Sequence, residues 1–304
     1  YPDDAAYQVE RALSYFEREF GVRPRSMWPA EGSVHEDVIR IFAERGVEVI
    51  CTDQRVLERS RENARAWFPY LVDSDSVQGD GGDKSDEMLI VFRDTELSNA
   101  IGFRYQSLTG QEATDDFFGH LANMAPRFGA DDRLVTVILD GENAWEEYRK
   151  EPDGKGFFHA LYGRLTDSDR VGEIMPVTLT EYIDGNPDRG IPRHDISSHT
   201  ELEPLWGGSW IDATYSIWVG ESEENIAWSF LKQAREDLGN AQVPQPSAAN
   251  PPPADLESED GLAFQAWDAL YAAEGSDWFW WYGDDMTNPS NDDSPFDQAF
   301  RTLL

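Results

Sequence analysis

A continuous apolar run at residues 134–139 ends directly at Asp140, and Glu142 follows two residues later. Six apolar or β-branched residues without polar alternation are typical of a strand buried on both faces, as in a parallel sheet. In parallel α/β folds the reactive groups lie where the carboxyl ends of the strands open to solvent. The run therefore predicts an α/β fold and places Asp140 and Glu142 at the functional edge of its sheet.

The same pattern recurs earlier in the chain, where three further predicted strands end in charged side chains. These ends are Glu31, Asp53, and Arg93 with Asp94. Predicted helices separate the strands, and this order implies parallel pairing with right-handed crossovers. Any one of these charges fits a solvated loop, but four successive charged strand ends favour a site.

Helical spacing of apolar residues predicts helices at 4–19, 34–45, 112–126, 156–165, 223–239 and 260–273. Gly21 is expected to end the first helix. Ser33 is expected to cap the second, with Glu36 completing a capping box. A short strand is predicted near residues 100–105.

The character of the sequence changes after Trp145, which predicts two regions. We expect residues 1–150 to form part of a barrel and residues 151–304 to form a mainly helical region with aromatic loops. Within the second region, the Pro-rich stretch 243–260 is predicted to be an exposed insertion. Five aromatic residues in the acidic window 274–285 either close the end of the barrel or wall a cleft.

The charge of the chain limits its partners. It carries 59 acidic and 25 basic residues, a formal net charge of −34. Nucleic acid and anionic membranes are excluded as partners because both require clustered Lys and Arg. High acidity with only four lysines is typical of a protein adapted to concentrated salt, where screening weakens self-repulsion. The alternative is an acidic mesophilic enzyme.

Cysteine content and hydropathy add two further limits. Cys51 is the single cysteine, so the chain has neither a disulfide framework nor a cysteine-based metal site. No apolar run reaches transmembrane length, and the acidic amphipathic residues 1–20 do not resemble a signal peptide. We therefore expect the cytoplasm of a salt-adapted microbe rather than secretion.

Three functions fit carboxylates at strand ends. Glycoside hydrolysis needs two carboxyl groups, and Glu31 and Asp140 lie on different strands, as catalytic pairs on barrels usually do. Alternatively Asp53, Asp94, Asp140 and Glu142 could bind Mg²⁺ or Ca²⁺. The third possibility is a non-catalytic carbohydrate-binding or structural module. Serine catalysis has no support, since a Gly-x-Ser-x-Gly motif is absent, and we expect no cofactor.

Five stretches carry a more specific signal. They are Trp28-Pro-Ala-Glu31-Gly-Ser33, Phe92-Arg-Asp-Thr-Glu-Leu-Ser98, Leu139-Asp-Gly-Glu-Asn-Ala-Trp145-Glu, Gly208-Ser-Trp210-Ile and Gly275-Ser-Asp-Trp-Phe-Trp-Trp281. In order and spacing they resemble the motifs of glycoside hydrolase family 57, most of all its amylase and amylopullulanase-like branch. The resemblance extends over about the whole chain.

This resemblance implies an incomplete (β/α)7-type barrel followed by a mainly helical region. It also implies action on α-glucans, such as starch and maltooligosaccharides, with retention of configuration. The nucleophile then falls on Glu31 and the general acid/base on Asp140. A 4-α-glucanotransferase or branching enzyme of the same family, and a non-catalytic α-glucan-binding fragment, remain alternatives.

The resemblance also implies substrate-binding residues. Ser276, Asp277 and Trp278 match the motif that lines the substrate cleft. Trp28, Trp145, Trp210 and Trp278 are candidates for stacking on sugar rings, with core packing as the alternative for each.

Two neighbours of Asp140 and one strand-end arginine complete the predicted site. Burial and the carboxylates of Glu142 and Glu31 are expected to raise the pKa of Asp140, as a general acid requires. Asn143 either orients a sugar hydroxyl or satisfies loop backbone. Arg93 either holds a carboxylate of the site or pairs structurally with Asp94, and we favour the structural role.

One departure from the family pattern concerns the start of the barrel. The first two motifs of the family, one containing His and one containing Glu, would precede residue 1. We therefore expect an N-terminal segment or a second chain to complete the barrel and cover the edge of the sheet.

Overall fold

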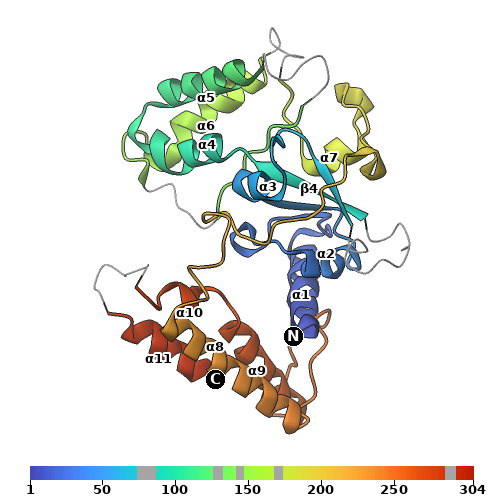
Figure 1. Cartoon of the computed structure of the whole chain (residues 1–304), viewed down its shortest axis with the longest axis vertical. Coiled ribbons are helices and arrows are strands. Elements are labelled where there is room, and N and C mark those ends of the chain that lie inside the picture. The colour runs from blue at the N-terminus through green and yellow to red at the C-terminus, as the bar shows by residue number, and fades with distance from the viewer. Residues whose placement is uncertain (74–86, 126–132, 142–146, 168–173, 285–291) are drawn as a thin grey trace.

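The computed structural model of the chain describes residues 1–73, 87–125, 133–141, 147–167, 174–284 and 292–304 (Figure 1). It has two parts: a sheet flanked by helices in the upper half of the view, and a group of helices below it. Among the helices in these ranges, none is long and apolar enough to cross a membrane.

Within the described ranges, a four-stranded sheet with the order β1–β2–β4–β3 forms the centre of the first part. Strands β1 (Ser26–Met27), β2 (Val49–Asp53) and β4 (Glu87–Arg93) pair in parallel. Strand β3 (Tyr70–Asp73) pairs antiparallel with the first half of β4. The parallel pairing confirms the strand–helix–strand prediction.

Strands β2 and β4 are buried on both faces, which explains their continuous apolar sequences. Ile50 and Ile90 pack into one hydrophobic cluster, whereas Cys51 and Leu89 pack into another. Adjacent residues of a strand point to opposite faces, so these two clusters lie on the two sides of the sheet. Both clusters remove apolar surface from water, which is the main driving force for this fold.

The helices of the first part surround or extend from this sheet (Figure 1). They are α1 (Pro2–Phe20), α2 (Glu36–Ala43), α3 (Gln54–Ser60), α4 (Thr95–Asn99), α5 (Gly110–Met124), α6 (Lys155–Leu165) and α7 (Leu179–Asp184). Side chains of α1, α2 and α3 pack into the cluster that contains Ile50, and Ile183 of α7 packs into the opposite one. Helices α4, α5 and α6 contribute to a third cluster.

The C-terminal helices form a separate core rich in aromatic residues. They are α8 (Ser222–Asn240), α9 (Glu259–Ala273), α10 (Asp277–Trp280) and α11 (Ser294–Leu303). Phe279 stacks on Trp228 with ring centroids 3.8 Å apart and packs edge-on against Phe300. At least this part of the aromatic window therefore builds the core of the helical part, and it neither closes a barrel nor walls a cleft.

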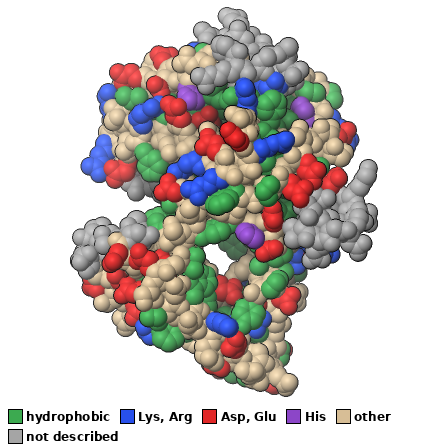
Figure 2. All heavy atoms as spheres, viewed as in Figure 1, with side chains coloured by type: hydrophobic (Ala, Val, Ile, Leu, Met, Phe, Trp, Pro, Cys, Tyr) green, Lys and Arg blue, Asp and Glu red, His purple; other side chains and the backbone are tan. Residues whose placement is uncertain are grey.

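Helix α1 connects the two parts. It ends at Gly21 in the left-handed conformation, as predicted. Leu13 is buried in the cluster that contains Ile50, whereas Tyr7 stacks on Tyr271 of α9 with ring centroids 4.1 Å apart. Figure 2 shows an opening between the two parts of the molecule.

Two local predictions were wrong. Helix α2 is capped by His35, whose Nδ1 accepts a hydrogen bond from the Asp37 N–H, and not by Ser33. The predicted capping partner, Glu36, instead accepts from the Leu205 N–H at 2.9 Å. Residues 100–105, predicted as a strand, begin with a π-helical turn (Ala100–Arg104) that directly follows α4.

The strand predicted at residues 134–140 was also wrong in part. These residues are half-buried, and the structure assigns them a single β-bridge, between Thr136 and Arg93. Strand β3 already occupies this side of β4 along its first half. Only the carboxyl end of β4 is therefore available to this segment, which still brings it to the predicted edge of the sheet.

Candidate functional site

The carboxyl ends of the parallel strands meet at one edge of the sheet. Asp53 and Arg93, the last residues of β2 and β4, lie directly opposite each other in the register. Glu31 follows the end of β1, which is the neighbour of β2. Residues 134–140 run beside the end of β4 through Thr136. The structure thus gathers the predicted strand-end charges at a common edge.

Glu31 lies in a tight turn, η1 (Ala30–Gly32), directly after β1. Its φ of 56° is in the left-handed region, which is uncommon for a residue other than glycine and is found at functional sites. The side chain is half-buried. The carbonyl oxygen of Gly32 accepts a 2.6 Å hydrogen bond from the Thr52 hydroxyl, which attaches the turn to β2.

Trp210 holds Glu31 at two points. Its indole Nε1–H donates to Oε2 of Glu31 at 2.6 Å, and its backbone N–H donates to the Glu31 carbonyl at 3.0 Å. The rings of Trp28 and Trp210 form a T-shaped pair with centroids 6.3 Å apart and an interplanar angle of 86°. The Glu31 carboxylate is therefore oriented by an indole, with these two tryptophans beside it.

The loop that carries Trp210 is fixed to the sheet edge by Arg55. The Arg55 guanidinium donates to the Trp210 carbonyl and to Oδ1 of Asp212, the latter at 2.7 Å. The same guanidinium donates to Asp53 at 3.2 Å. Sequence patterns missed Arg55, and its position two residues beyond a strand-end aspartate was the available signal.

A buried ion pair lies behind this loop. Arg93 Nε donates to Oδ2 of Asp53 at 2.6 Å, with 2% and 0% of the two side chains exposed. The Thr95 hydroxyl also donates to Asp53, at 3.0 Å. The predicted pairing of Arg93 with Asp94 was wrong, because the Asp94 carboxylate caps α4 by accepting from the Leu97 N–H at 2.8 Å.

Asp140 is half-buried and makes interactions of its own. The segment before it is attached to β4 and α4: the Asp94 N–H donates to the Thr136 carbonyl at 2.7 Å, and the Ile138 N–H donates to the Ser98 hydroxyl at 3.2 Å. These bonds keep the segment beside the carboxyl end of β4.

The remaining predicted site residues fall into two groups. Glu142, Asn143 and Trp145 lie outside the residues that the structure describes. Ser276, Asp277 and Trp278 lie at the start of α10, in the helical part of the chain. Trp278 donates its indole N–H to the Ala272 carbonyl at 2.9 Å and packs near Phe300. The contacts described for Trp278 thus belong to the helical core.

Metal binding and cysteine chemistry find little support in the described residues. Among them, the structure holds no group of three or more His, Cys, Asp and Glu side chains that could bind a metal ion. Asp53 and Asp94, two of the candidate ligands, already accept hydrogen bonds from protein groups. Burial raises the pKa of Cys51 to about 12, so this thiol is not a nucleophile at neutral pH.

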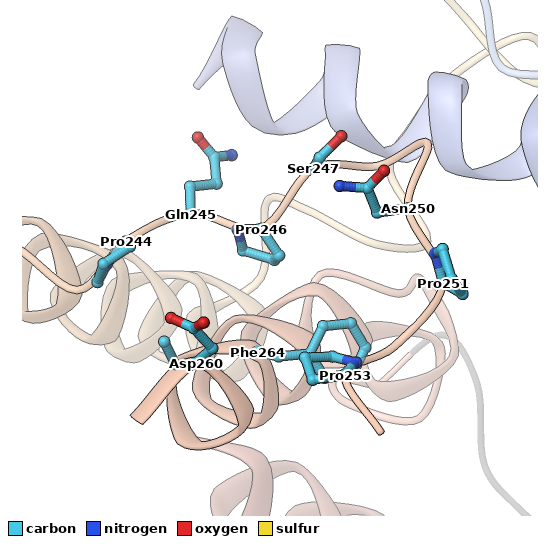
Figure 3. Close-up of a pocket in the computed structure, with 10 residues that line it drawn as sticks. Pro244, Gln245, Pro246, Ser247, Asn250, Pro251, Pro253, Asp260 and Phe264 are labelled. Carbon is cyan, nitrogen blue, oxygen red and sulfur yellow. The ribbon is translucent and has the colours of Figure 1, made fainter. Parts of the chain in front are cut away.

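A cavity of about 250 Å³ lies in the other part of the chain, between the Pro-rich stretch and α9 (Figure 3). Its lining combines proline rings with polar side chains and Phe264. The lining residues come from positions 244–264, so this cavity is separate from the edge that carries Glu31.

Parallel strands with carboxylates at their carboxyl edge are the arrangement used by barrel enzymes that cleave glycosidic bonds. The chain belongs to glycosyl hydrolase family 57, whose family model matches residues 1–197. Its fold is accordingly an α/β fold with an incomplete (β/α)7-type barrel followed by a mainly helical region. None of the curated proteins matches the chain.

Solved structures with a similar fold include a branching enzyme and two amylases. The branching enzyme of Pyrococcus horikoshii aligns with a TM-score of 0.67 and 15% identity, over 99% of this chain and 59% of its own. The α-amylase AmyC of Thermotoga maritima aligns with a TM-score of 0.66 and 14% identity, over 99% and 62%. A maltose-forming amylase of Pyrococcus sp. ST04 gives 0.61 and 11%, over 92% and 56%. The chain thus spans less than two thirds of each of these proteins.

Proposed function

We propose that this chain carries the active site of a retaining glycoside hydrolase that acts on α-glucans, of the α-amylase or amylopullulanase type. Glu31 is the nucleophile and Asp140 the general acid/base. The observation that carries the proposal is the orientation of Glu31: a carboxylate at the end of a parallel strand, held by the Trp210 indole 2.6 Å away. Membership of glycosyl hydrolase family 57 supports the same reaction class.

The chemistry proceeds in two displacements at the anomeric carbon. Asp140 gives its proton to the glycosidic oxygen while a Glu31 carboxylate oxygen forms a bond to the anomeric carbon, and the bond to the leaving sugar breaks. Asp140, now ionised, then takes a proton from water as the water oxygen attacks the same carbon and releases Glu31. A retaining pair requires carboxyl groups about 5–5.5 Å apart.

Trp210 contributes to both binding and reactivity. Its indole N–H occupies one carboxylate oxygen of Glu31, which directs the other oxygen toward the substrate. The Trp28 ring, and the face of Trp210 that Arg93 does not cover, can stack on sugar rings, whose C–H faces match aromatic surfaces. Ser276, Asp277 and Trp278 are proposed to line the cleft from the helical part, and Glu142, Asn143 and Trp145 to surround Asp140.

Transfer is the alternative outcome of the same chemistry. A sugar hydroxyl in place of water in the second step makes the enzyme a 4-α-glucanotransferase or branching enzyme. The fold similarity to the branching enzyme of Pyrococcus horikoshii keeps this alternative open. Substrate contacts supplied by an N-terminal segment or a second chain are part of the proposal, because the chain spans only 59% of that protein.

The test is a product profile from maltooligosaccharides in concentrated KCl, with Glu31→Gln as the variant. Shorter products alone indicate hydrolysis, whereas longer products accompanied by shorter ones indicate transfer, because each transfer also releases the leaving fragment. Glu31→Gln removes the nucleophile and is expected to lower the rate by about 10³-fold or more. The control is Glu58→Gln, which changes an exposed residue of α3 and leaves the rate unchanged.

Two results would contradict this function. An unchanged rate in Glu31→Gln would exclude the proposed nucleophile. A folded wild-type chain that binds maltoheptaose without cleaving it would favour the carbohydrate-binding module.

A further inference from the structure

Arg93 is a buried arginine at the end of β4. It contacts both Trp210, which orients Glu31, and the segment that leads to Asp140. Its side chain is 2% exposed and pairs with the fully buried Asp53. Buried ion pairs contribute little net stability, because desolvation offsets most of their attraction, and apolar residues often replace them without loss. Stability alone therefore does not account for this pair, and the guanidinium makes further contacts on both sides.

On one side, Arg93 fixes the group that orients Glu31. The guanidinium carbon lies 4.4 Å from the centroid of the Trp210 ring, a cation–π contact in a desolvated setting. This contact sets the plane of the indole, and the plane sets the direction of the N–H that Trp210 donates to Glu31 at 2.6 Å. A tilt of the ring would move the Glu31 carboxylate with it.

On the other side, Arg93 reaches the segment that carries Asp140. Its Nη1 donates to the carbonyl of Ile138 at 3.4 Å, two residues before Asp140. Its Nη2 donates to Oδ1 of Asn99 at 3.0 Å. These bonds, together with the one from Nε to Asp53, fix all three nitrogens of the guanidinium in one plane.

We propose that Arg93 is a positioning residue that sets the spacing between Glu31 and Asp140, acting on the first through Trp210 and on the second through the Ile138 carbonyl. This inference rests on the proposed function of the two carboxylates. Lysine cannot replace Arg93 in this role, because an ammonium group has no planar fork to satisfy three partners while covering an indole face.

The chain offers a matched control for the test. In the helical part, Arg235 donates to both carboxylate oxygens of the buried Asp4, at 2.5 and 3.1 Å. Its guanidinium carbon lies 4.7 Å from the centroid of a Trp267 ring. This site repeats the arginine–aspartate–tryptophan arrangement away from Glu31, so Arg235→Lys reports the cost of losing such a cluster without the positioning role.

The experiment compares Arg93→Lys with Arg235→Lys in kinetics on maltooligosaccharides and in thermal unfolding. Both variants are expected to lose similar stability. Only Arg93→Lys should lower kcat, by about 10- to 100-fold with KM changed less than about twofold, since displacement of a reacting group by about 1 Å can cost 10²-fold. Equal kcat values for the two variants, or a rise in KM alone, would overturn the proposal.

Two further measurements keep the test decisive. If Arg93→Lys does not fold, Trp210→Phe retains an aromatic ring beneath Arg93 and removes the N–H to Glu31 together with part of the indole surface. A wild-type kcat in Trp210→Phe, or a rise in KM alone, overturns the inference, and a fall in kcat with KM changed less than about twofold supports it. Crystal structures of the wild type and Arg93→Lys give the Glu31–Asp140 carboxyl separation directly. An unchanged separation refutes the positioning role, whether or not the wild type is active. An inactive wild type refutes the proposed function, so the two failures are distinguishable.

Discussion

Glu31 and Gly32 are consecutive residues with left-handed backbone conformations, at φ values of 56° and 60°. For a residue other than glycine this conformation costs roughly 1–2 kcal/mol, which the surrounding contacts must offset. The offsetting contacts are the bonds from Trp210 and Thr52 to this turn. The strain at Glu31 is therefore part of how its carboxylate is aimed at the edge of the sheet.

Gly32 is predicted to be irreplaceable for two reasons, its left-handed backbone and its close approach to Trp28. A Cβ atom at this position would lie 2.4 Å from the Trp28 ring. Gly32→Ala is expected to cost about 2–4 kcal/mol, from left-handed strain plus overpacking, and to lower activity because Trp28 and Glu31 both shift. Urea unfolding and initial rates measure the two effects.

Gly46 provides the control for this substitution. It has a φ of 79° and open space around the position of a Cβ atom. Gly46→Ala should therefore show only the left-handed strain, about 1 kcal/mol, with unchanged activity. Equal losses in the two variants would show that the contact with Trp28 does not matter.

At the scale of elements, a local pattern was predictive where the element is buried as its own sequence specifies, and it failed where a neighbouring strand limits the pairing. The apolar runs of β2 and β4 and the amphipathic spacing of α1 correctly predicted their structures, because each element is buried in the manner its own sequence specifies. Residues 134–139 have the same apolar character but lie half-buried beside one strand end. Because β3 pairs with the first half of β4, only the carboxyl end of β4 is open to residues 134–139. The local sequence of residues 134–139 does not encode this limit.

In the candidate site, too, some features followed from local sequence and others depended on tertiary packing. The strand-end position of Asp53 and Arg93 followed from sequence, since residue type and strand periodicity are local properties. The hydrogen bond from Trp210 to Glu31 joins residues 179 positions apart. Arg93 pairs with Asp53 and lies over the Trp210 ring, whereas its sequence neighbour Asp94 caps α4. Which partner a side chain contacts depends on tertiary packing and could not be predicted from the spacing of motifs.

The contact between α1 and α9 predicts a pH dependence of stability. Glu274 accepts a hydrogen bond from Gln8 at 3.1 Å. Burial raises the pKa of Glu274 to about 7; the Gln8 hydrogen bond and Arg235 oppose this rise, and Asp4 adds to it. Between its ordinary pKa of 4.5 and about 7, the folded chain retains a proton that the unfolded chain has lost. Stability should therefore fall as pH rises through this window.

Glu274→Gln removes this dependence, because glutamine cannot ionise and still offers Gln8 an acceptor oxygen. The variant is expected to gain stability over the wild type progressively from pH 5 to pH 8, by on the order of 1 kcal/mol at the upper end. Thermal unfolding at pH 5, 6, 7 and 8 measures the difference. The exposed Glu257→Gln serves as the control for the loss of a negative charge. A pH-independent difference would disprove the assignment.

At the scale of the whole molecule, charge is the dominant feature. A formal net charge of −34 on 304 residues creates self-repulsion that opposes the compact state. Figure 2 shows acidic side chains distributed over both parts of the visible face. Screening lengths fall from about 10 Å at 0.1 M salt to about 3 Å at 1 M, so salt removes most of this repulsion.

The chain is therefore predicted to gain stability in concentrated KCl. Between 0.1 M and 2 M we expect the midpoint of thermal unfolding to rise by about 5 °C or more, equivalent to roughly 2 kcal/mol. High salt also strengthens apolar burial, and that contribution does not depend on charge. The same titration at pH 5, closer to the sequence pI of 4.3, separates the two effects, because partial protonation of the carboxylates should reduce the rise. An equal rise at pH 5 and pH 7 would assign the gain to apolar burial, and a flat midpoint at pH 7 would exclude salt adaptation.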